Sequence, residues 1–237
     1  MQFAENRQDI EWLVKSFLEL SCITQSETMT INRPTYVPND TRWNQQYGLH
    51  IIEADLAYDL WDIEGGEIPG QMSEGEIVVG VADDACDWDH PDLIQNIWQN
   101  LGEDADGDGS VLEGQGNNWD FDPQDINGVD DDGDGYVDNF IGWDFTGGGD
   151  NDPIYPSNSL SHGTSVAGCV SSMTNNSTGV ASVGWSVKIM PFRCSDSGQY
   201  IDYGYNGILA AAQMGANVIN CSWGGFGGGN QSVINTA

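Results

Sequence analysis

The stretch SLSHGTSVAG, residues 159–168, contains His162, one of only three histidines in the chain. The residues after it are small and apolar at helical spacing, which predicts a helix with His162 in its first turn. A second stretch, EIVVGVADD, is a valine-rich run typical of a buried strand, and it ends in Asp83 and Asp84. A carboxylate at such a strand end can hold an imidazole in one tautomer and stabilise its protonated form. The imidazole is then a general base for a nucleophile.

Gly163, directly after the histidine, would let another backbone approach closely. A lone histidine is more often a surface or core residue, and an aspartate at a strand end is often only a turn former. The assignment of Asp83 and His162 to chemistry therefore depends on the segments around them.

The elements around these residues alternate between strand and helix patterns. After the helix that begins at His162, a strand is predicted at VKIMPFR (187–193) and a helix at YIDYGYNGILAAAQMG (200–215), with Gly215 as its stop. A further strand is predicted at ANVINCSWGG (216–225) and a further helix at NQSVINTA (230–237). This order predicts an α/β fold with a parallel β-sheet flanked by helices. In such sheets, sites lie at the carboxyl ends of the strands, where Asp83 and Ser222 would both fall.

The first part of the chain differs from the rest. Residues 8–20 have helical spacing, and the two prolines of TINRPTYVPNDTRW then predict an extended connector. We therefore divide the chain into residues 1–40 and a domain at 41–237. Within that domain, an insert at 103–152 is dense in Asp and Gly.

Four blocks resemble those of subtilisin-like serine proteases. VVGVADDACDWDHPDL resembles the aspartate block, HGTSVAG the histidine block, VKIMPFR the strand that follows, and GANVINCSWGG the substrate-cleft segment; NQQYGLHIIEADLAYDLWDIEGG also resembles the segment that opens the mature enzyme. The order Asp before His is that of subtilisins. The resemblance implies a three-layer α/β/α fold and endopeptidase activity, with Asp83 as the triad acid and His162 as the general base. It also implies that Ser222, Trp223 and Gly224 line a cleft and pair with bound peptide as an added strand.

Three departures from the family pattern matter. Ala85 stands where relatives have glycine, which would cost on the order of 1 kcal/mol if the position needed a positive φ. The family's Gly-Thr-Ser nucleophile block and its Asn-containing oxyanion block do not occur before Ala237. None of Ser165, Ser171, Ser172 and Ser222 stands in such a block.

MQFAEN, at the other end of the chain, resembles the end of a subtilase propeptide. We therefore expect an incomplete amino-terminal portion of a subtilase catalytic domain, inactive by itself. The resemblance implies a secreted parent that acts on polypeptide substrates, with its own propeptide as inhibitor and folding chaperone.

The insert contains two stretches with the spacing Asp-x-Asp-x-Asp-Gly. The first carries Asp104, Asp106 and Asp108; the second carries Asp130, Asp132 and Asp134, with Asp138 at its ninth position. Alternate carboxylates converging on one hard cation, with glycine at the sharp turn, are typical of EF-hand-type Ca²⁺ loops. The twelfth position holds Gln115 or Ile141 instead of glutamate, so these are related loops and not EF-hands. Many subtilases carry a similar stretch at this place. The alternative interpretation of the two Asp-x-Asp-x-Asp-Gly stretches is a solvated acidic loop without a bound ion.

Asp92, in the sequence HPDL, is a further candidate calcium ligand implied by the resemblance, with a turn former as its alternative.

The composition limits the partners of this chain. Six basic and 37 acidic residues give a net charge of −31, which repels nucleic acids and anionic membranes. No apolar run approaches the roughly 18–20 residues of a membrane helix. The five cysteines form no C-x-x-C pair, and the apolar runs around Cys169 and Cys221 predict that these two are core residues.

Two other functions are compatible with parts of the pattern. The chain could be a non-catalytic calcium-binding scaffold or pseudoenzyme that retains the protease fold. A phosphoacceptor pair at Asp83 and Asp84 is the third alternative, but it leaves HGTSVAG and the acidic stretches without a role.

Overall fold

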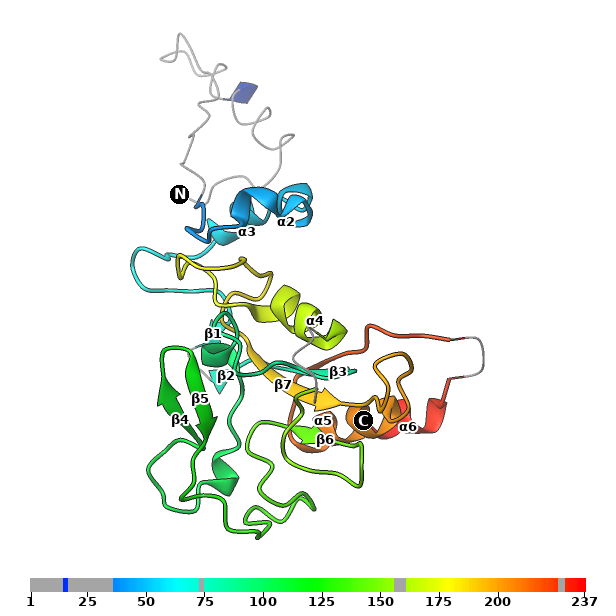
Figure 1. Ribbon diagram of the computed structural model, residues 1–237. Coiled ribbons are helices and arrows are strands. Elements are labelled where there is room, and N and C mark those ends of the chain that lie inside the picture. Colours follow the sequence, from blue (N-terminus) through cyan, green and yellow to red (C-terminus); the bar gives the residue numbers. More distant parts are fainter. Residues whose placement is uncertain (1–14, 17–35, 73–74, 156–160, 226–228) are drawn as a thin grey trace. The chain divides into compact units, whose positions relative to one another are not determined.

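The computed structural model describes residues 15–16, 36–72, 75–155, 161–225 and 229–237 (Figure 1). The chain divides into two compact units, Met1–Thr35 and Tyr36–Ala237. All but residues 15–16 of the helix expected at 8–20 lie outside the described residues. The second unit contains every element discussed below.

A four-stranded, wholly parallel sheet forms the centre of the second unit. Its order is β6 (Trp143–Asp144), β7 (Lys188–Arg193), β3 (Val78–Asp83) and β8 (Val218–Asn220). Strand β3 pairs with β7 along its whole length, from Val78 opposite Lys188 to Asp83 opposite Arg193. Every residue of β3 is buried, as its continuous valine-rich sequence predicts.

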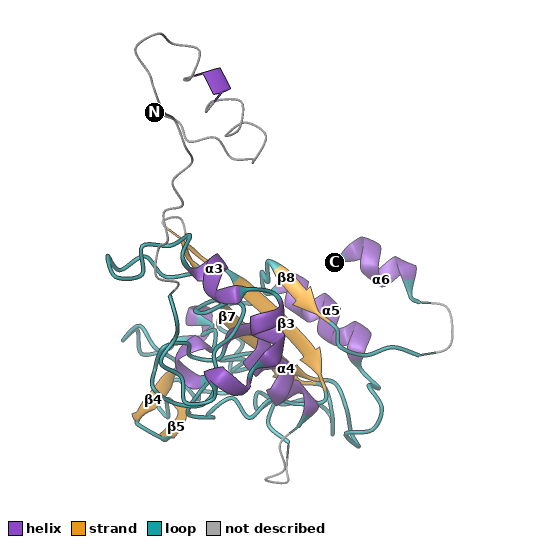
Figure 2. Ribbon diagram, turned by 90° about the horizontal axis from the view of Figure 1, so that it is seen from above, coloured by secondary structure: helices purple, strands orange, loops and turns teal. Residues whose placement is uncertain are grey.

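Helices cover both faces of this sheet (Figure 2). Val79 and Val81 of β3 pack in one cluster with α4 (His162–Ser171). Val78 and Ala82 pack in a second cluster with α5 (Gly204–Gln213). The alternation follows from the two-residue period of a strand. The expected α/β fold, a parallel sheet flanked by helices, is thereby confirmed.

Short elements complete the fold. They are the 3₁₀ turns η1 (Trp43–Gln45), η2 (Ile94–Asn96) and η3 (Leu101–Glu103), the helices α2 (Tyr47–Ile51), α3 (Ala54–Tyr58) and α6 (Gln231–Thr236), and the antiparallel pairs β1 (Gln71–Met72) with β2 (Gly75–Glu76) and β4 (Leu112–Gln115) with β5 (Asn118–Phe121). None of the described helices is long and apolar enough to cross a membrane.

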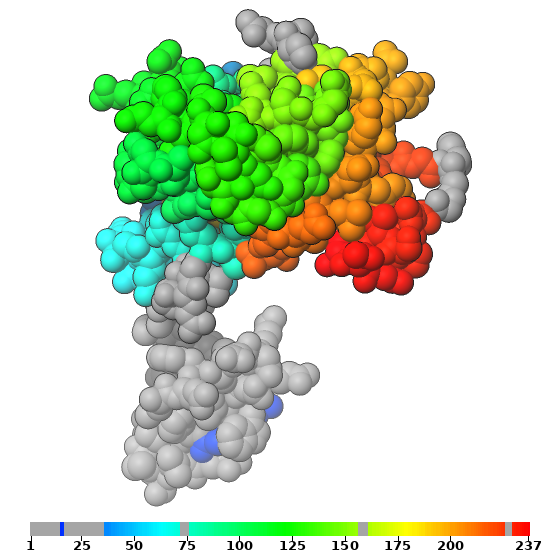
Figure 3. Space-filling model, turned by 90° about the horizontal axis from the view of Figure 1, so that it is seen from below, coloured from blue at the N-terminus to red at the C-terminus, as the bar shows by residue number. Residues whose placement is uncertain are grey.

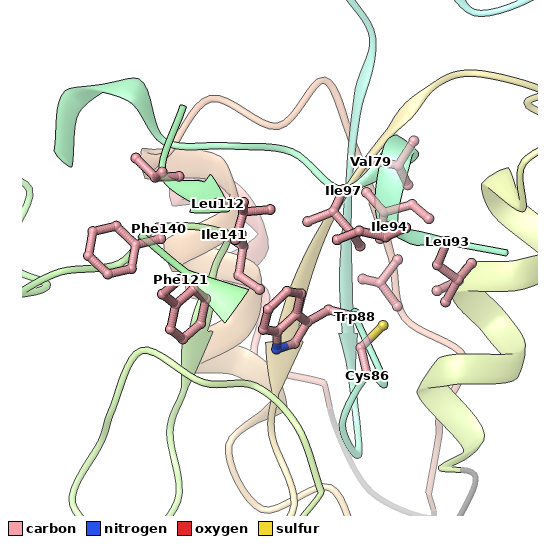
Figure 4. Close-up of a cluster of buried hydrophobic side chains, with 14 residues drawn as sticks. Val79, Cys86, Trp88, Leu93, Ile94, Ile97, Leu112, Phe121, Phe140 and Ile141 are labelled. Carbon is pink, nitrogen blue, oxygen red and sulfur yellow. The ribbon is translucent and has the colours of Figure 1, made fainter. Parts of the chain in front are cut away.

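The acidic insert is attached to the main core by its few apolar side chains (Figure 4). Val111, Phe140 and Ile141 are completely buried in the cluster that also holds β3 and α4. Phe121 stacks on Trp88, with 5.0 Å between the ring centroids, and lies 5.3 Å from the ring of Phe140. These side chains hold the insert to the main core, and the insert covers a broad part of the face seen in Figure 3 (green).

The strands and helices expected between residues 76 and 237 are present, with two differences in extent. Helix α5 begins at Gly204, four residues later than the sequence pattern suggests, and ends before Gly215, whose φ is +88°. Strand β8 has only three residues.

The prediction that Cys169 and Cys221 are core residues was wrong, because both are exposed. The buried face of α4 contains Gly163, Thr164, Ala167 and Ser171, and Cys169 lies on the other side of the helix. Cys221 follows β8, which is the edge strand of the sheet. The four cysteines within the described residues form no disulfide, and Cys22 lies outside them.

Candidate active site and acidic loops

Asp83 and His162 meet at the carboxyl edge of the sheet. Asp83 is the last residue of β3, and His162 is the first residue of α4. Nδ1 of His162 lies 2.8 Å from Oδ1 of Asp83. The carboxylate side chain is only 2% exposed, whereas that of the histidine is 59% exposed. No residue in the described part of the chain hydrogen-bonds to Nε2 of His162, so this nitrogen is open to a proton donor.

The two groups influence each other's protonation. The hydrogen bond and the charge of Asp83 raise the pKa of His162 above its ordinary value. Burial raises the pKa of Asp83, and the hydrogen bond from His162 counteracts part of that increase. The N–H of Asp84 also donates to Oδ1 of Asp83, at 2.8 Å. These contacts favour an ionised aspartate next to a basic imidazole.

Asp84 fixes the start of the helix that presents the histidine. Its Oδ2 accepts from the N–H of His162 at 3.0 Å, and its Oδ1 accepts from the N–H of Gly163 at 2.7 Å. Ser161, the N-cap residue, accepts from the N–H of Thr164. No local sequence pattern indicates that Asp84 positions His162, because the contact joins residues far apart in the chain.

Gly163 allows the helix to touch the strand end. A Cβ on this residue would lie 2.2 Å from the carbonyl oxygen of Ala85 and 2.8 Å from Cβ of Asp83. The close backbone approach expected from the glycine is therefore present. Ala85 is not among the residues with positive φ, so its difference from the family's glycine causes no backbone strain.

An apolar groove opens beside the histidine. It has a volume of about 680 Å³ and is lined by His162, Ser165, Cys169 and residues of β3 and β8, and it continues to Ser222. Trp223 donates from Nε1 to the carbonyl oxygen of Ala82 at 2.7 Å, while Gly224 is exposed with open space around its Cα. The structure thus places the Ser222–Gly224 segment at the same sheet edge as the Asp83–His162 pair.

The two Asp-x-Asp-x-Asp-Gly stretches fold into loops of the same form, here called the first acidic loop (104–110) and the second acidic loop (130–136). In each loop the carboxylate of the first aspartate accepts hydrogen bonds from two backbone N–H groups. Asp104 accepts from Gly107 and Gly109, and Asp130 accepts from Gly133 and Gly135. Gly109 has a φ of +95° and Gly135 of +101°, a region that favours glycine.

Both loops gather oxygen ligands. In the first loop, oxygens of Asp104, Asp106 and Asp108 all lie within 4.8 Å of one another. In the second, Asp130 and Asp132 form such a group with Glu103. Three neighbouring carboxylates repel each other unless a cation lies between them, and oxygen ligands suit Ca²⁺. The residues present therefore fit a hard cation.

The other predicted ligands lie nearby or elsewhere. Asp134 accepts from the side chain of Asn139, and Asp138 accepts from the N–H groups of Asn127 and Gly128. Asp92 is not part of the acidic loops. Its carboxylate accepts from the side chain of Asn176 and from the N–H of Val180.

Asp40 is a candidate ligand that the sequence reasoning missed. It is buried near Asp92, with which it interacts electrostatically, and it accepts from the N–H of Asn175. Its Oδ1 is buried without a hydrogen-bond partner among the described residues. The unpartnered oxygen of Asp40 marks this place, against the 175–180 turn, as a further candidate for a cation.

The fold and the Asp–His pair define the class of the protein. The model of the Subtilase family matches residues 74–237, which is more than half of the chain, and the chain belongs to this family of serine proteases.

Individual relatives agree with this assignment. The chain is 30% identical to thermitase of Thermoactinomyces vulgaris over 208 residues, which cover 85% of this chain and 54% of thermitase. It is 30% identical to the thermophilic serine proteinase of Bacillus sp. strain AK1, covering 91% of this chain and 41% of that protein. It is also 30% identical to an extracellular protease of Xanthomonas campestris, covering 98% of this chain and 37% of that protein. The chain thus spans about half or less of the length of these relatives.

Proposed function

We propose that this chain carries the acid and the base of a subtilisin-like serine endopeptidase, and that the nucleophilic serine lies in a segment beyond residue 237. The observation that carries the proposal is the 2.8 Å contact between buried Asp83 and exposed His162. Membership of the Subtilase family supports it. Both oxygens of Asp84 accept backbone N–H groups, an arrangement that does not favour a phosphoacceptor role for this pair.

The proposed mechanism assigns a separate task to each group. Nε2 of His162 takes the proton of the serine hydroxyl as the serine attacks the peptide carbonyl, and later gives it to the leaving amine. Asp83 holds the ring through Nδ1 and stabilises the imidazolium that forms between these steps. The exposed Nε2 edge next to the apolar groove leaves space for a serine-bearing segment.

The proposed substrate is an extended polypeptide. Ser222, Trp223 and Gly224 follow the edge strand β8, whose outer side pairs with no other described strand. A peptide can add to such an edge by backbone hydrogen bonds, which gives affinity with little sequence preference.

We further propose that Ca²⁺ is the cation of the acidic loops. Asp104, Asp106 and Asp108 would hold it in the first loop; Asp130, Asp132 and Asp134, with Asp138 nearby, would hold it in the second. Asp92 and Asp40 would bind another ion. The proposed role of the ions is structural, because the segments that flank the two loops are buried in the main core through Val111 and Phe140, and no hydrogen bond joins the described loop residues to His162.

A secreted parent that is inhibited and assisted in folding by its own propeptide completes the proposal. One relative is named an extracellular protease, and a strongly acidic chain suits a medium whose cations screen its self-repulsion.

The proposal predicts that the product of the whole gene cleaves an unstructured protein such as casein. His162→Ala should lower kcat by roughly 10⁶-fold because the proton acceptor is lost. His50→Gln is the matched control, since His50 bonds to the carbonyl of Trp43, outside the proposed triad, and it should leave kcat nearly unchanged. Equal activity of His162→Ala and wild type would contradict the triad. Absence of activity in the wild-type whole product would favour the calcium-binding scaffold.

A further inference from the structure

A carboxylate from outside each acidic loop holds the start of that loop. In the second loop, the N–H groups of Asp131 and Asp132 donate to Oε1 of Glu103, at 2.9 and 3.1 Å. Glu103 is only 1% exposed, and one of its oxygens lies within 4.8 Å of carboxylate oxygens of Asp130 and Asp132. It is therefore already part of the second loop's oxygen cluster.

Asp125 makes the corresponding backbone contacts with the first loop. Its Oδ1 accepts from the N–H groups of Ala105 and Asp106, at 2.9 and 3.2 Å. Ala105 and Asp106 are the second and third residues of the first loop, just as Asp131 and Asp132 are the second and third residues of the second loop. Asp125 is completely buried, and its Oδ2 has no hydrogen-bond partner within the described ranges of the chain. A buried, unpartnered carboxylate oxygen on a residue that is hydrogen-bonded to the backbone of the first loop is stabilised by a cation.

The two carboxylates are exchanged between the loops. Glu103 directly precedes Asp104, the first residue of the first loop, yet it contacts the second loop. Asp125 precedes the second loop in the chain, yet it contacts the first. In an EF-hand the corresponding carboxylate comes from position twelve of the same loop. That position holds Gln115 or Ile141 here.

We propose that Asp125 completes the calcium site of the first acidic loop and that Glu103 completes that of the second. The inference rests on the proposed binding of Ca²⁺ by the insert. Because each site is closed by a residue from the segment that leads into the other loop, ordering one site positions a ligand of the other. Binding at the two sites is therefore coupled, and the coupling is reciprocal.

Counting bound calcium by equilibrium dialysis and atomic emission tests this exchange. Asp106→Asn removes the first site and Asp132→Asn the second, as references. Asp125→Asn keeps the shape and an acceptor oxygen but removes the charge. Asp125→Asn should bind one calcium ion fewer than wild type. The double variant Asp125→Asn/Asp106→Asn should bind as many ions as Asp125→Asn alone, whereas Asp125→Asn/Asp132→Asn should bind two fewer than wild type. Glu103→Gln should also bind one ion fewer, with no further loss when it is combined with Asp132→Asn and a loss of two ions when it is combined with Asp106→Asn. Glu113 is an exposed acid on β4, and Glu113→Gln should leave the number of bound ions unchanged.

The outcomes separate this inference from the calcium proposal. If Asp106→Asn/Asp132→Asn binds as many ions as wild type, the calcium proposal for the loops is wrong. If those references lose ions but Asp125→Asn binds as wild type does, or Asp125→Asn/Asp132→Asn loses only one, the exchange is wrong.

Hydrogen exchange on the Asp132→Asn protein tests the same point without altering Asp125. Calcium should slow exchange at residues 122–126 together with the first loop. Protection of the first loop alone would overturn the inference.

Discussion

At the scale of single residues, the proposed chemistry depends on one hydrogen bond between a buried acid and an exposed base. Asp83 is surrounded by protein, so its charge acts on His162 with little screening by water. The raised pKa of His162 follows from that contact. Activity should therefore rise with pH through this raised pKa, since only the neutral imidazole accepts the proton of serine.

Asp83→Asn should lower the pKa of His162, because the charge and the hydrogen bond that raise it are lost or reversed. An NMR titration of the His162 ring protons measures this directly, with Asp202→Asn, an exposed acid, as control. In the whole protein the same change should reduce kcat by roughly 10⁴-fold. An unchanged pKa in Asp83→Asn would show that the pair does not interact in solution.

The same shift predicts a pH dependence of stability. The pKa of His162 is higher in the folded protein than in the unfolded protein. The Asp83–His162 pair therefore makes its full contribution to stability at pH values below the ordinary histidine pKa, as long as Asp83 stays ionised. The contribution is lost as the pH rises through the raised pKa.

At the scale of elements, the site depends on how closely α4 approaches the end of β3. Gly163→Ala places a Cβ against the carbonyl of Ala85 and should displace His162 from Asp83. Gly168→Ala is the matched control on the same helix, because nothing lies within 4 Å of its Cβ position. It should stabilise the protein by up to about 1 kcal/mol through helix propensity.

Thermal unfolding and the His162 pKa distinguish the two glycine variants. Gly163→Ala should melt earlier and shift the pKa of His162 toward its ordinary value. Equal melting temperatures for the two variants would contradict the role given to Gly163.

Local patterns predicted the elements, and long-range contacts did not follow from them. The valine-rich run predicted β3, the small-residue run predicted α4, and the family blocks predicted that Asp83 and His162 would be paired. Asp84, Asp40, Asp125 and the contact of Glu103 with the second loop were missed, because each acts on residues distant in sequence. The exposure of Cys169 was missed because an apolar helical run does not show which face is buried.

At the scale of the whole molecule, the balance of charge is the dominant feature. A net charge of −31 opposes a compact fold, and the acidic insert concentrates part of it on one surface (Figure 3). If the acidic loops bind cations as proposed, the cations offset this repulsion and stabilise the folded state according to their concentration and affinity.

Removal of calcium should therefore lower the melting temperature of the intact protein by several degrees, since about 1 kcal/mol corresponds to roughly 2–4 °C at this size. Calorimetry in excess EDTA, with re-addition of Ca²⁺ and separately of Mg²⁺, measures the effect. Calcium should restore the original melting temperature. A melting curve that EDTA leaves unchanged would be evidence against structural calcium.

Covalent labelling of the whole gene product with a fluorophosphonate, followed by mass spectrometry of the labelled peptide, tests the proposed Asp83–His162–serine triad directly. We expect one labelled serine, located beyond residue 237, and loss of the label in His162→Ala. A label on Ser165 or Ser222, or a label that survives His162→Ala, would contradict this triad.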